Sequence, residues 1–166
     1  MRFSVDQRIA GPCDDVVAAF VDPAFYEELG QMPKIGRPEI LERREADGTV
    51  HLRVRYAFTG DLAAPARAVL DPTKMTWVVE SSVDRTAHRT EFRMLPDHYG
   101  KRLECHGSYV LEADGADTTV QHFQGELIVH YPVVGSLAER GIVTGLKEHL
   151  AEEATILERW LAQRRR

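Results

Sequence analysis

The sequence predicts an α+β protein in which a curved, seven-stranded antiparallel sheet wraps around one long C-terminal helix. Alternation of apolar and polar residues, which is the period of a half-buried strand, recurs over residues 2–10 and through most of 38–130. Helical spacing of apolar residues occurs in two short stretches after the first strand and again over 133–164. A sheet with one dry face must cover that face, and the C-terminal helix is the only long element that can do so.

The predicted first strand, at 2–10, is followed by two short helices. Apolar residues recur at helical spacing from residue 16 to 20. The pair Asp22-Pro23 ends this helix, because proline lacks the amide hydrogen that a helix interior needs. A second helical stretch then runs to Gly30, a residue type that is common at helix C-termini.

Six further strands are predicted between residues 38 and 130. Asp47-Gly48 lies between two alternating segments and is a strong hairpin signal, and ADGAD at 113–117 is a second turn. Residues 59–73 predict a crossover with one helical turn. The predicted inner face is mostly apolar, and its aromatic members are Tyr56, Trp77, Phe92, Tyr109 and Phe123. Polar residues at predicted inner positions include Gln7, Ser81, His88, Thr90 and Gln121.

Composition limits the classes of protein that fit. The chain has 166 residues, a net charge of −5 and 43% hydrophobic residues, which suits one domain spanning 1–166 with one core. The negative charge argues against nucleic-acid binding, which draws on clustered positive charge. No apolar run is long enough for a membrane span, so a membrane protein is not expected.

The N-terminus lacks a signal-peptide pattern and Cys13 and Cys105 form no CxxC pair, so the expected location is the cytoplasm. No pattern indicates an oligomeric state.

The order of these elements resembles the START-like superfamily, also called SRPBCC or helix-grip proteins. The segments FTGDLAAPARAVLDPTKMTWVVESSVD and PVVGSLAERGIVTGLKEHLAEEATILERWL are similar to an uncharacterised, mainly actinobacterial branch of it. Members of the superfamily include lipid-transfer domains, pollen-allergen-type ligand carriers and polyketide aromatase/cyclases. The resemblance covers nearly the whole chain, and it implies a helix-grip fold with a cavity between the sheet and the C-terminal helix.

Glycines in the first turns of the predicted C-terminal helix need an explanation, because each costs about 1 kcal/mol relative to alanine in a helix interior. At about 100° per residue, Ile142 and Leu146 lie on the stripe that faces the sheet, and Gly141 and Gly145 flank it. The glycines either permit close packing or a kink of the helix, or they leave room for a ligand or its route of access. The resemblance favours room for a ligand.

The same projection places His149 and Glu153 within about 20° of the centre of that stripe, one turn apart. An unpaired buried carboxylate is costly, so Glu153 is expected to be paired, hydrated in a cavity or swung out to the rim. A His149–Glu153 pair inside the pocket would orient a polar ligand group or act as an acid/base couple. The alternative is that the long glutamate side chain simply reaches water.

Three functions are compatible with this sequence. The leading hypothesis is a carrier or sensor that binds a hydrophobic small molecule, such as a lipid or polyketide-like compound. The second is an aromatase/cyclase-type enzyme, cyclase- or dehydratase-like, that uses His149 and Glu153 with a tyrosine. The third is a protein-partner module with a filled core and an exposed apolar patch.

No catalytic, metal or cofactor motif favours the enzyme over the carrier. The chain has no GxSxG, GxGxxG, P-loop or HExxH pattern, and no two histidines have a metal-ligand spacing. No catalytic residue, metal or cofactor is therefore assigned. The expected ligand-binding residues are His149, Glu153, Gly145, Gly141, Ile142, Leu146, Tyr56, Trp77, Phe92, Tyr109 and Phe123.

Overall fold

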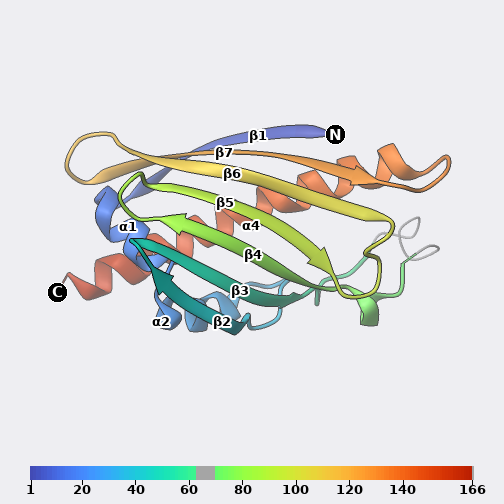
Figure 1. The fold of residues 1–166 in the computed structure, drawn as a ribbon, viewed down its shortest axis with the longest axis horizontal. Coiled ribbons are helices and arrows are strands. Elements are labelled where there is room, and N and C mark those ends of the chain that lie inside the picture. Colours follow the sequence, from blue (N-terminus) through green and yellow to red (C-terminus); the bar gives the residue numbers. More distant parts are fainter. Residues whose placement is uncertain (63–69, 166) are drawn as a thin grey trace.

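The structure is a computed structural model that describes residues 1–62 and 70–165. Within these residues a seven-stranded antiparallel sheet, in the order β1-β7-β6-β5-β4-β3-β2, curves around a long C-terminal helix, which confirms the predicted α+β architecture (Figure 1). The strands are β1 (Arg2–Ala10), β2 (Glu39–Ala46), β3 (Thr49–Ala57), β4 (Thr76–Asp84), β5 (Arg89–Pro96), β6 (Leu103–Ala113) and β7 (Thr118–Val129). The helices are α1 (Cys13–Ala19), α2 (Pro23–Glu28) and α4 (Gly135–Arg164), with single 3-10 turns at η1 (Leu29–Gln31) and η2 (Pro72–Lys74).

Local sequence signals account for the turns that shape the sheet and the short helices. Asp47 and Gly48 have φ angles of 53° and 77°, the left-handed pair that a tight two-residue hairpin requires between β2 and β3. Asp22 accepts a hydrogen bond of 2.9 Å from the amide of Ala24 and so caps α2. The predicted crossover at 59–73 falls partly on 63–69, outside the described residues, while η2 supplies a helical turn near its end.

The two edges of the sheet are β1 and β2. Five of the eight residues of β2 are charged, and the strand is largely exposed. Arg43 on β2 donates a hydrogen bond of 2.9 Å from its Nε atom to the carbonyl of Val21, which lies between α1 and α2. This contact ties the outermost strand to the short helices.

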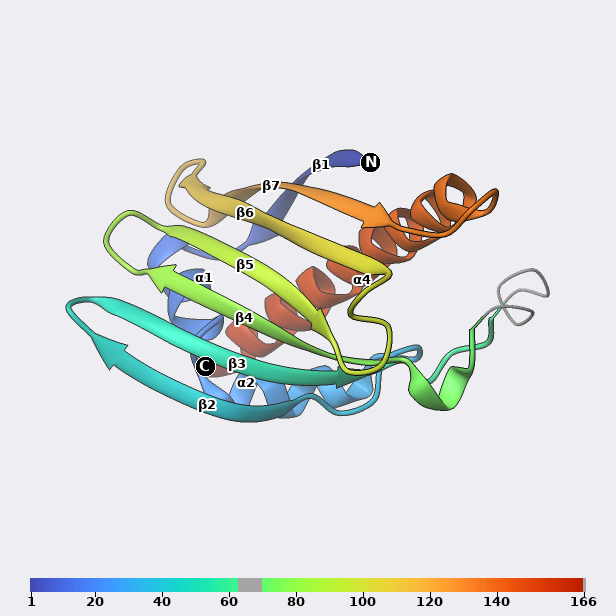
Figure 2. The same cartoon turned by 45° about the vertical axis from the view of Figure 1, so that its right-hand side comes forward.

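The helix α4 crosses the sheet on the side that also carries α1 and α2 (Figure 2). Its C-terminal half packs on α1 and α2 and is closed by large side chains. Leu157 is completely buried, and the ring of Trp160 lies 5.6 Å from the ring of Phe25. Leu157, Trp160 and Leu161 are all buried and fill this half.

Two facing glycines bring β6 and β7 close to the aromatic rings of neighbouring strands. Gly107 and Gly125 are register partners. A Cβ atom on Gly107 would lie 2.2 Å from the carbonyl oxygen of Gln124, and one on Gly125 would lie 2.7 Å from the ring of Phe3. Only glycine fits these two positions, because other residue types would collide with backbone or with a buried ring.

None of the described helices combines the length and the apolar character that crossing a bilayer requires.

Candidate ligand-binding site

His149 and Glu153 lie one turn apart on α4 and form the polar centre of the candidate site. The Nε2 atom of His149 is 3.8 Å from the Oε2 atom of Glu153, and the two side chains are 21% and 14% exposed. The Nδ1 atom of His149 is buried without a hydrogen-bond partner, the only such side-chain atom among the residues that the structure describes. A buried nitrogen without a partner is an unusual and costly arrangement, which marks this position as one able to accept a further polar contact.

Burial shifts the pKa of each group in the direction that favours its neutral form. Loss of hydration raises the pKa of Glu153 to about 7 and lowers the pKa of His149 to about 4. Between these two values the carboxyl group holds its proton and the imidazole has none. The pair is therefore largely uncharged in mildly acidic solution, and Glu153 ionises near neutral pH.

Aromatic rings of β3 and β4 cover this polar pair. The ring of Tyr56 lies 6.4 Å from the ring of His149, nearly perpendicular to it. Tyr56 also stacks on Trp77 at a centroid distance of 5.9 Å and an interplanar angle of 12°. The register pairs Tyr56 directly with Trp77 across the two strands, so this stack follows from the alternation seen in the sequence.

Three tyrosines from different elements lie around Glu153: Tyr26 on α2, Tyr56 on β3 and Tyr109 on β6. Burial raises the pKa of each phenol, and the negative charge of Glu153 adds to the shift. The hydroxyl of Tyr26 donates a hydrogen bond of 3.0 Å to the carbonyl of Phe20. Sequence reasoning did not select Tyr26, because helical spacing on a short segment does not fix how that helix docks on the sheet.

A second aromatic row continues across β5, β6 and β7. The ring of Tyr109 stacks on that of Phe123 at 5.8 Å, and Phe92 lies 5.0 Å from Phe123. Ile142 and Leu146 of α4 pack against the cluster to which Phe123 belongs. All five aromatic residues expected on the inner face thus lie in one wall, with Tyr109 linking its two parts.

The three glycines of α4 have different surroundings. A Cβ atom on Gly135 would lie 2.6 Å from the carbonyl oxygen of Val129, so close packing explains this residue. Gly141 and Gly145 are not packed against other elements, since a Cβ atom on either would meet no described atom within 4 Å. They share a side of the helix with Glu148, one turn further on.

Exposure differs between the two halves of α4. The C-terminal half faces a closed core, as described above. Inner-face residues of the sheet, and residues in the first half and middle of α4, keep part of their surface accessible to water. These partly exposed residues are Tyr56, Trp77, Phe92, Tyr109, Ile142, Leu146, His149 and Glu153.

A separate cluster of reactive groups joins α1 to the β4–β5 turn. The Sγ atom of Cys13 lies 3.2 Å from Nδ1 of His88, and Nε2 of His88 lies 3.0 Å from Oδ1 of Asp14. The prediction that His88 occupies an inner strand position is wrong: it lies in the turn with a φ of 51°. Burial and the neighbouring charge of Asp14 raise the pKa of Cys13, so the thiol keeps its proton.

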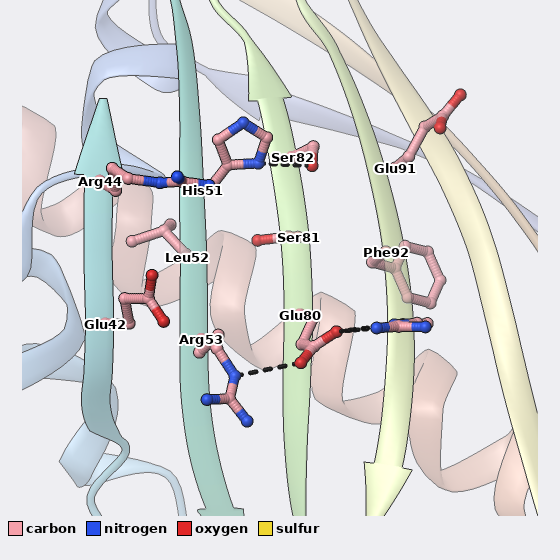
Figure 3. A pocket seen from close by; sticks show the side chains of 11 residues that line it. Glu42, Arg44, His51, Leu52, Arg53, Glu80, Ser81, Ser82, Glu91 and Phe92 are labelled. Atoms are coloured by element: carbon pink, nitrogen blue, oxygen red, sulfur yellow. Dashed lines mark hydrogen bonds and ion pairs between the residues drawn. The ribbon is translucent and has the colours of Figure 1, made fainter. Parts of the chain in front are cut away.

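The outer face of the sheet carries a shallow hollow of about 470 Å³ over β2 to β5, shown in Figure 3 with α4 behind the strands. The charges at its centre are paired with one another. Glu80 lies between Arg53, at 3.0 Å, and Arg93, whose Nε donates to it at 2.6 Å. His51 bonds to Ser82 at 2.9 Å. Because the central acid is neutralised by two arginines, we place the candidate site on the inner face.

In residues 1–62 and 70–165, no group of three or more histidine, cysteine, aspartate or glutamate side chains is arranged to hold a metal ion. The inner face is lined instead by aromatic rings, with one histidine and one glutamate. That lining suits an organic molecule with a few polar atoms.

A curved antiparallel sheet that closes on a C-terminal helix, with an aromatic inner face reached by water, is the architecture of helix-grip proteins. This chain belongs to the family described as "Protein of unknown function (DUF2505)", whose profile matches residues 4–161. No curated protein sequence matches the chain.

Solved structures share this fold at low sequence identity. The protein TTHA0849 from Thermus thermophilus is 16% identical, with a TM-score of 0.71 over 98% of each chain. The Zhui aromatase/cyclase from Streptomyces sp. R1128 is 15% identical, with a TM-score of 0.69 over 100% of this chain and 96% of that one. Norcoclaurine synthase from Thalictrum flavum is 17% identical, with a TM-score of 0.67 over 98% and 86%. These likenesses establish the helix-grip fold.

Proposed function

We propose that this protein is a carrier or sensor that binds a hydrophobic small molecule, such as a lipid or a polyketide-like compound, between the sheet and the N-terminal half of α4. The observation that carries the proposal is the contrast along α4, where large side chains close one half and aromatic side chains opposite the other half stay accessible to water. Accessible aromatic surface next to a few placed polar groups is typical of small-molecule sites.

The lining indicates what kind of molecule fits. The stacked rings of Tyr56 and Trp77 and the row through Phe123 offer flat apolar surfaces for a ring system or an acyl chain. His149 and Glu153 offer the polar contacts that would orient it.

The glycine side of α4 is the proposed route of access. Gly141 and Gly145 leave open space beside the helix, and one turn further on Glu148 forms a 2.8 Å ion pair with Lys34. This ion pair ties α4 to the segment after η1 and limits the opening at that end. A ligand would pass between the ion pair and the start of the helix.

The test is native mass spectrometry of the purified protein, followed by solvent extraction and identification of bound compounds. A stoichiometric hydrophobic adduct is expected, and Gly145→Leu should reduce its occupancy because the new side chain fills the access side. Ala151→Leu is the matched control, since Ala151 is exposed on the opposite side of the same helix. A ligand-free mass, with no shift in the presence of lipids and aromatic compounds, would contradict the proposal and favour a protein-partner module.

A second candidate function is an enzyme of the aromatase/cyclase type. The observation in its favour is that Glu153 ionises near neutral pH beside a neutral imidazole, which suits an acid/base couple. Two of the solved structures named above are of enzymes, an aromatase/cyclase and a synthase. Glu153→Gln distinguishes the functions, because it would abolish turnover in an enzyme, while a carrier would still bind uncharged ligands through the aromatic wall.

The remaining expectations are also proposals: a cytoplasmic location, one domain over 1–166, and membership of a mainly actinobacterial branch. Their support is the sequence pattern.

A further inference from the structure

We propose that the ligand is a lipophilic amine, whose ammonium group binds the Glu153 carboxylate while its apolar body lies on the aromatic wall. This inference rests on the proposed function, because it needs the space between the sheet and α4 to hold a small molecule. It adds the chemical class of that molecule.

The first step is that Glu153 has no cation of its own. In residues 1–62 and 70–165, no lysine or arginine forms an ion pair with it, and its one ion-pair partner is His149. Lys34, which reaches α4 from the segment after η1, is bound to Glu148. A carboxylate held out of bulk water without a counter-ion is strongly disfavoured, and a cationic ligand would remove that penalty.

The second step is that the other groups facing Glu153 cannot supply a positive charge. They are His149 on its own helix, Tyr26 from α2, Tyr56 from β3 and Tyr109 from β6. Burial keeps the imidazole neutral and the phenols protonated at neutral pH. An ammonium group would therefore be the one cation opposite the one anion of the site.

The third step is the lining next to the carboxylate. The faces of Tyr56 and Trp77 are stacked in parallel beside His149, and Tyr109 lies within the electrostatic reach of Glu153 from β6. Aromatic faces attract ammonium groups, and the attraction grows when the cation is taken out of water. Aromatic surface around a single carboxylate thus favours an organic cation over an anion.

The competing occupant is a neutral, hydroxyl-bearing ligand that uses the protonated form of Glu153 as a hydrogen-bond donor. The two ligands differ in the direction of their pH dependence. An ammonium group needs the ionised carboxylate, so its binding strengthens as the pH rises through 7. A hydroxyl ligand that accepts from the protonated carboxyl would bind more weakly over the same range.

The experiment compares two probes of the same skeleton, 4-phenylbutylamine and 4-phenylbutan-1-ol, by isothermal titration calorimetry. The amine is protonated at both pH 8 and pH 5.5. With a pKa of about 7, the carboxyl of Glu153 is about nine-tenths ionised at pH 8 and about 3% ionised at pH 5.5, so the amine should bind up to about 30-fold more tightly at pH 8. At pH 6, binding of the amine should release about one proton, measurable in buffers of different ionisation enthalpy.

Glu153→Gln tests the residue itself. The variant should lose at least about 10-fold in affinity for the amine at pH 8, the size expected for losing one desolvated charge partner. Its affinity for the alcohol should change by less than about three-fold. Glu91→Gln, which removes an exposed carboxylate on the outer face of β5, should leave both affinities unchanged.

The failures of the two proposals can be told apart. If the alcohol binds and the amine shows no preference or no rise with pH, the amine inference is wrong and the proposed binding function stands. If the amine preference survives in Glu153→Gln, another group binds the cation and the inference is also wrong. If neither probe binds and purified protein carries no adduct, both proposals are overturned.

Discussion

The Nε2 atom of His149 lies 3.8 Å from the Oε2 atom of Glu153, and burial drives the two groups to opposite changes in pKa. Each group therefore makes the free energy of unfolding depend on pH, and the two dependences have opposite signs. Where both operate, they nearly cancel. Removing either side chain uncovers the effect of the other.

Glu153→Gln should change how stability depends on pH. The pKa of Glu153 is raised from 4.5, its ordinary value in the unfolded chain, to about 7 in the folded protein. Between these values the native state binds a proton that the unfolded state has released. Stability from this group is full below pH 4.5 and is lost as the pH rises through 7, by about 3 kcal/mol in total. In the variant this loss is absent, so its stability relative to wild type should increase from pH 4.5 to pH 7.5. Urea unfolding at the two pH values measures the difference, and equal differences would contradict the assignment.

His149→Gln should show the opposite behaviour. The pKa of His149 falls from 6.5 to about 4 on folding, so between these values the unfolded state binds the additional proton. Its contribution to stability increases by about 3 kcal/mol as the pH rises from 4 to 6.5, and the variant should lack this increase. The summed contribution of His149 and Glu153 should then be nearly constant between pH 4.5 and 6.5, so each single variant should change with pH relative to wild type. A sloping wild type with flat variants would show that the pair titrates as one ion pair instead.

The glycines of α4 should respond to alanine in opposite directions. Gly141→Ala should stabilise the protein by about 1 kcal/mol, because the new methyl group meets no described atom and alanine is the better helix former. Gly135→Ala should destabilise it, because the added Cβ would lie 2.6 Å from the carbonyl oxygen of Val129. Thermal unfolding of the two variants checks the prediction. Stabilisation by both would mean that the start of α4 can shift freely.

The Cys13–His88–Asp14 cluster should behave as a structural contact, because its thiol stays protonated. The raised pKa of Cys13 and its burial predict slow reaction with 5,5′-dithiobis(2-nitrobenzoic acid) at pH 7.5, with full reaction only in urea. Cys105, whose pKa burial raises to about 11, should react as slowly and serves as the internal reference. Rapid labelling of Cys13 alone would instead show that His88 takes its proton.

Helical periodicity was sufficient to predict the polar pair of the site. A fixed rotation per residue places His149 and Glu153 on the inner stripe, and the period of two in the strands places Tyr56 and Trp77 on the inner face. Both inferences use only the geometry of a single element or of two paired neighbours. The helices and strands were predicted correctly for the same reason.

Residues whose positions depend on contacts between distant elements could not be predicted in this way. Tyr26 reaches the site because α2 docks beside α4, and His88 meets Cys13 because a turn residue adopts a left-handed conformation. The open surroundings of Gly141 and Gly145 likewise depend on how far the sheet extends along α4. Periodicity carries no information on these distances.

The charged outer strand β2 bears on how the protein avoids self-association. An uncovered sheet edge presents a row of amide and carbonyl groups to which a strand of another molecule can add. With five charged residues in eight, and with Arg43 tied back to Val21, β2 discourages such addition by repulsion and by the cost of burying its charges. Replacing those charges with apolar residues would open a path to sheet extension and fibre formation without altering the inner face.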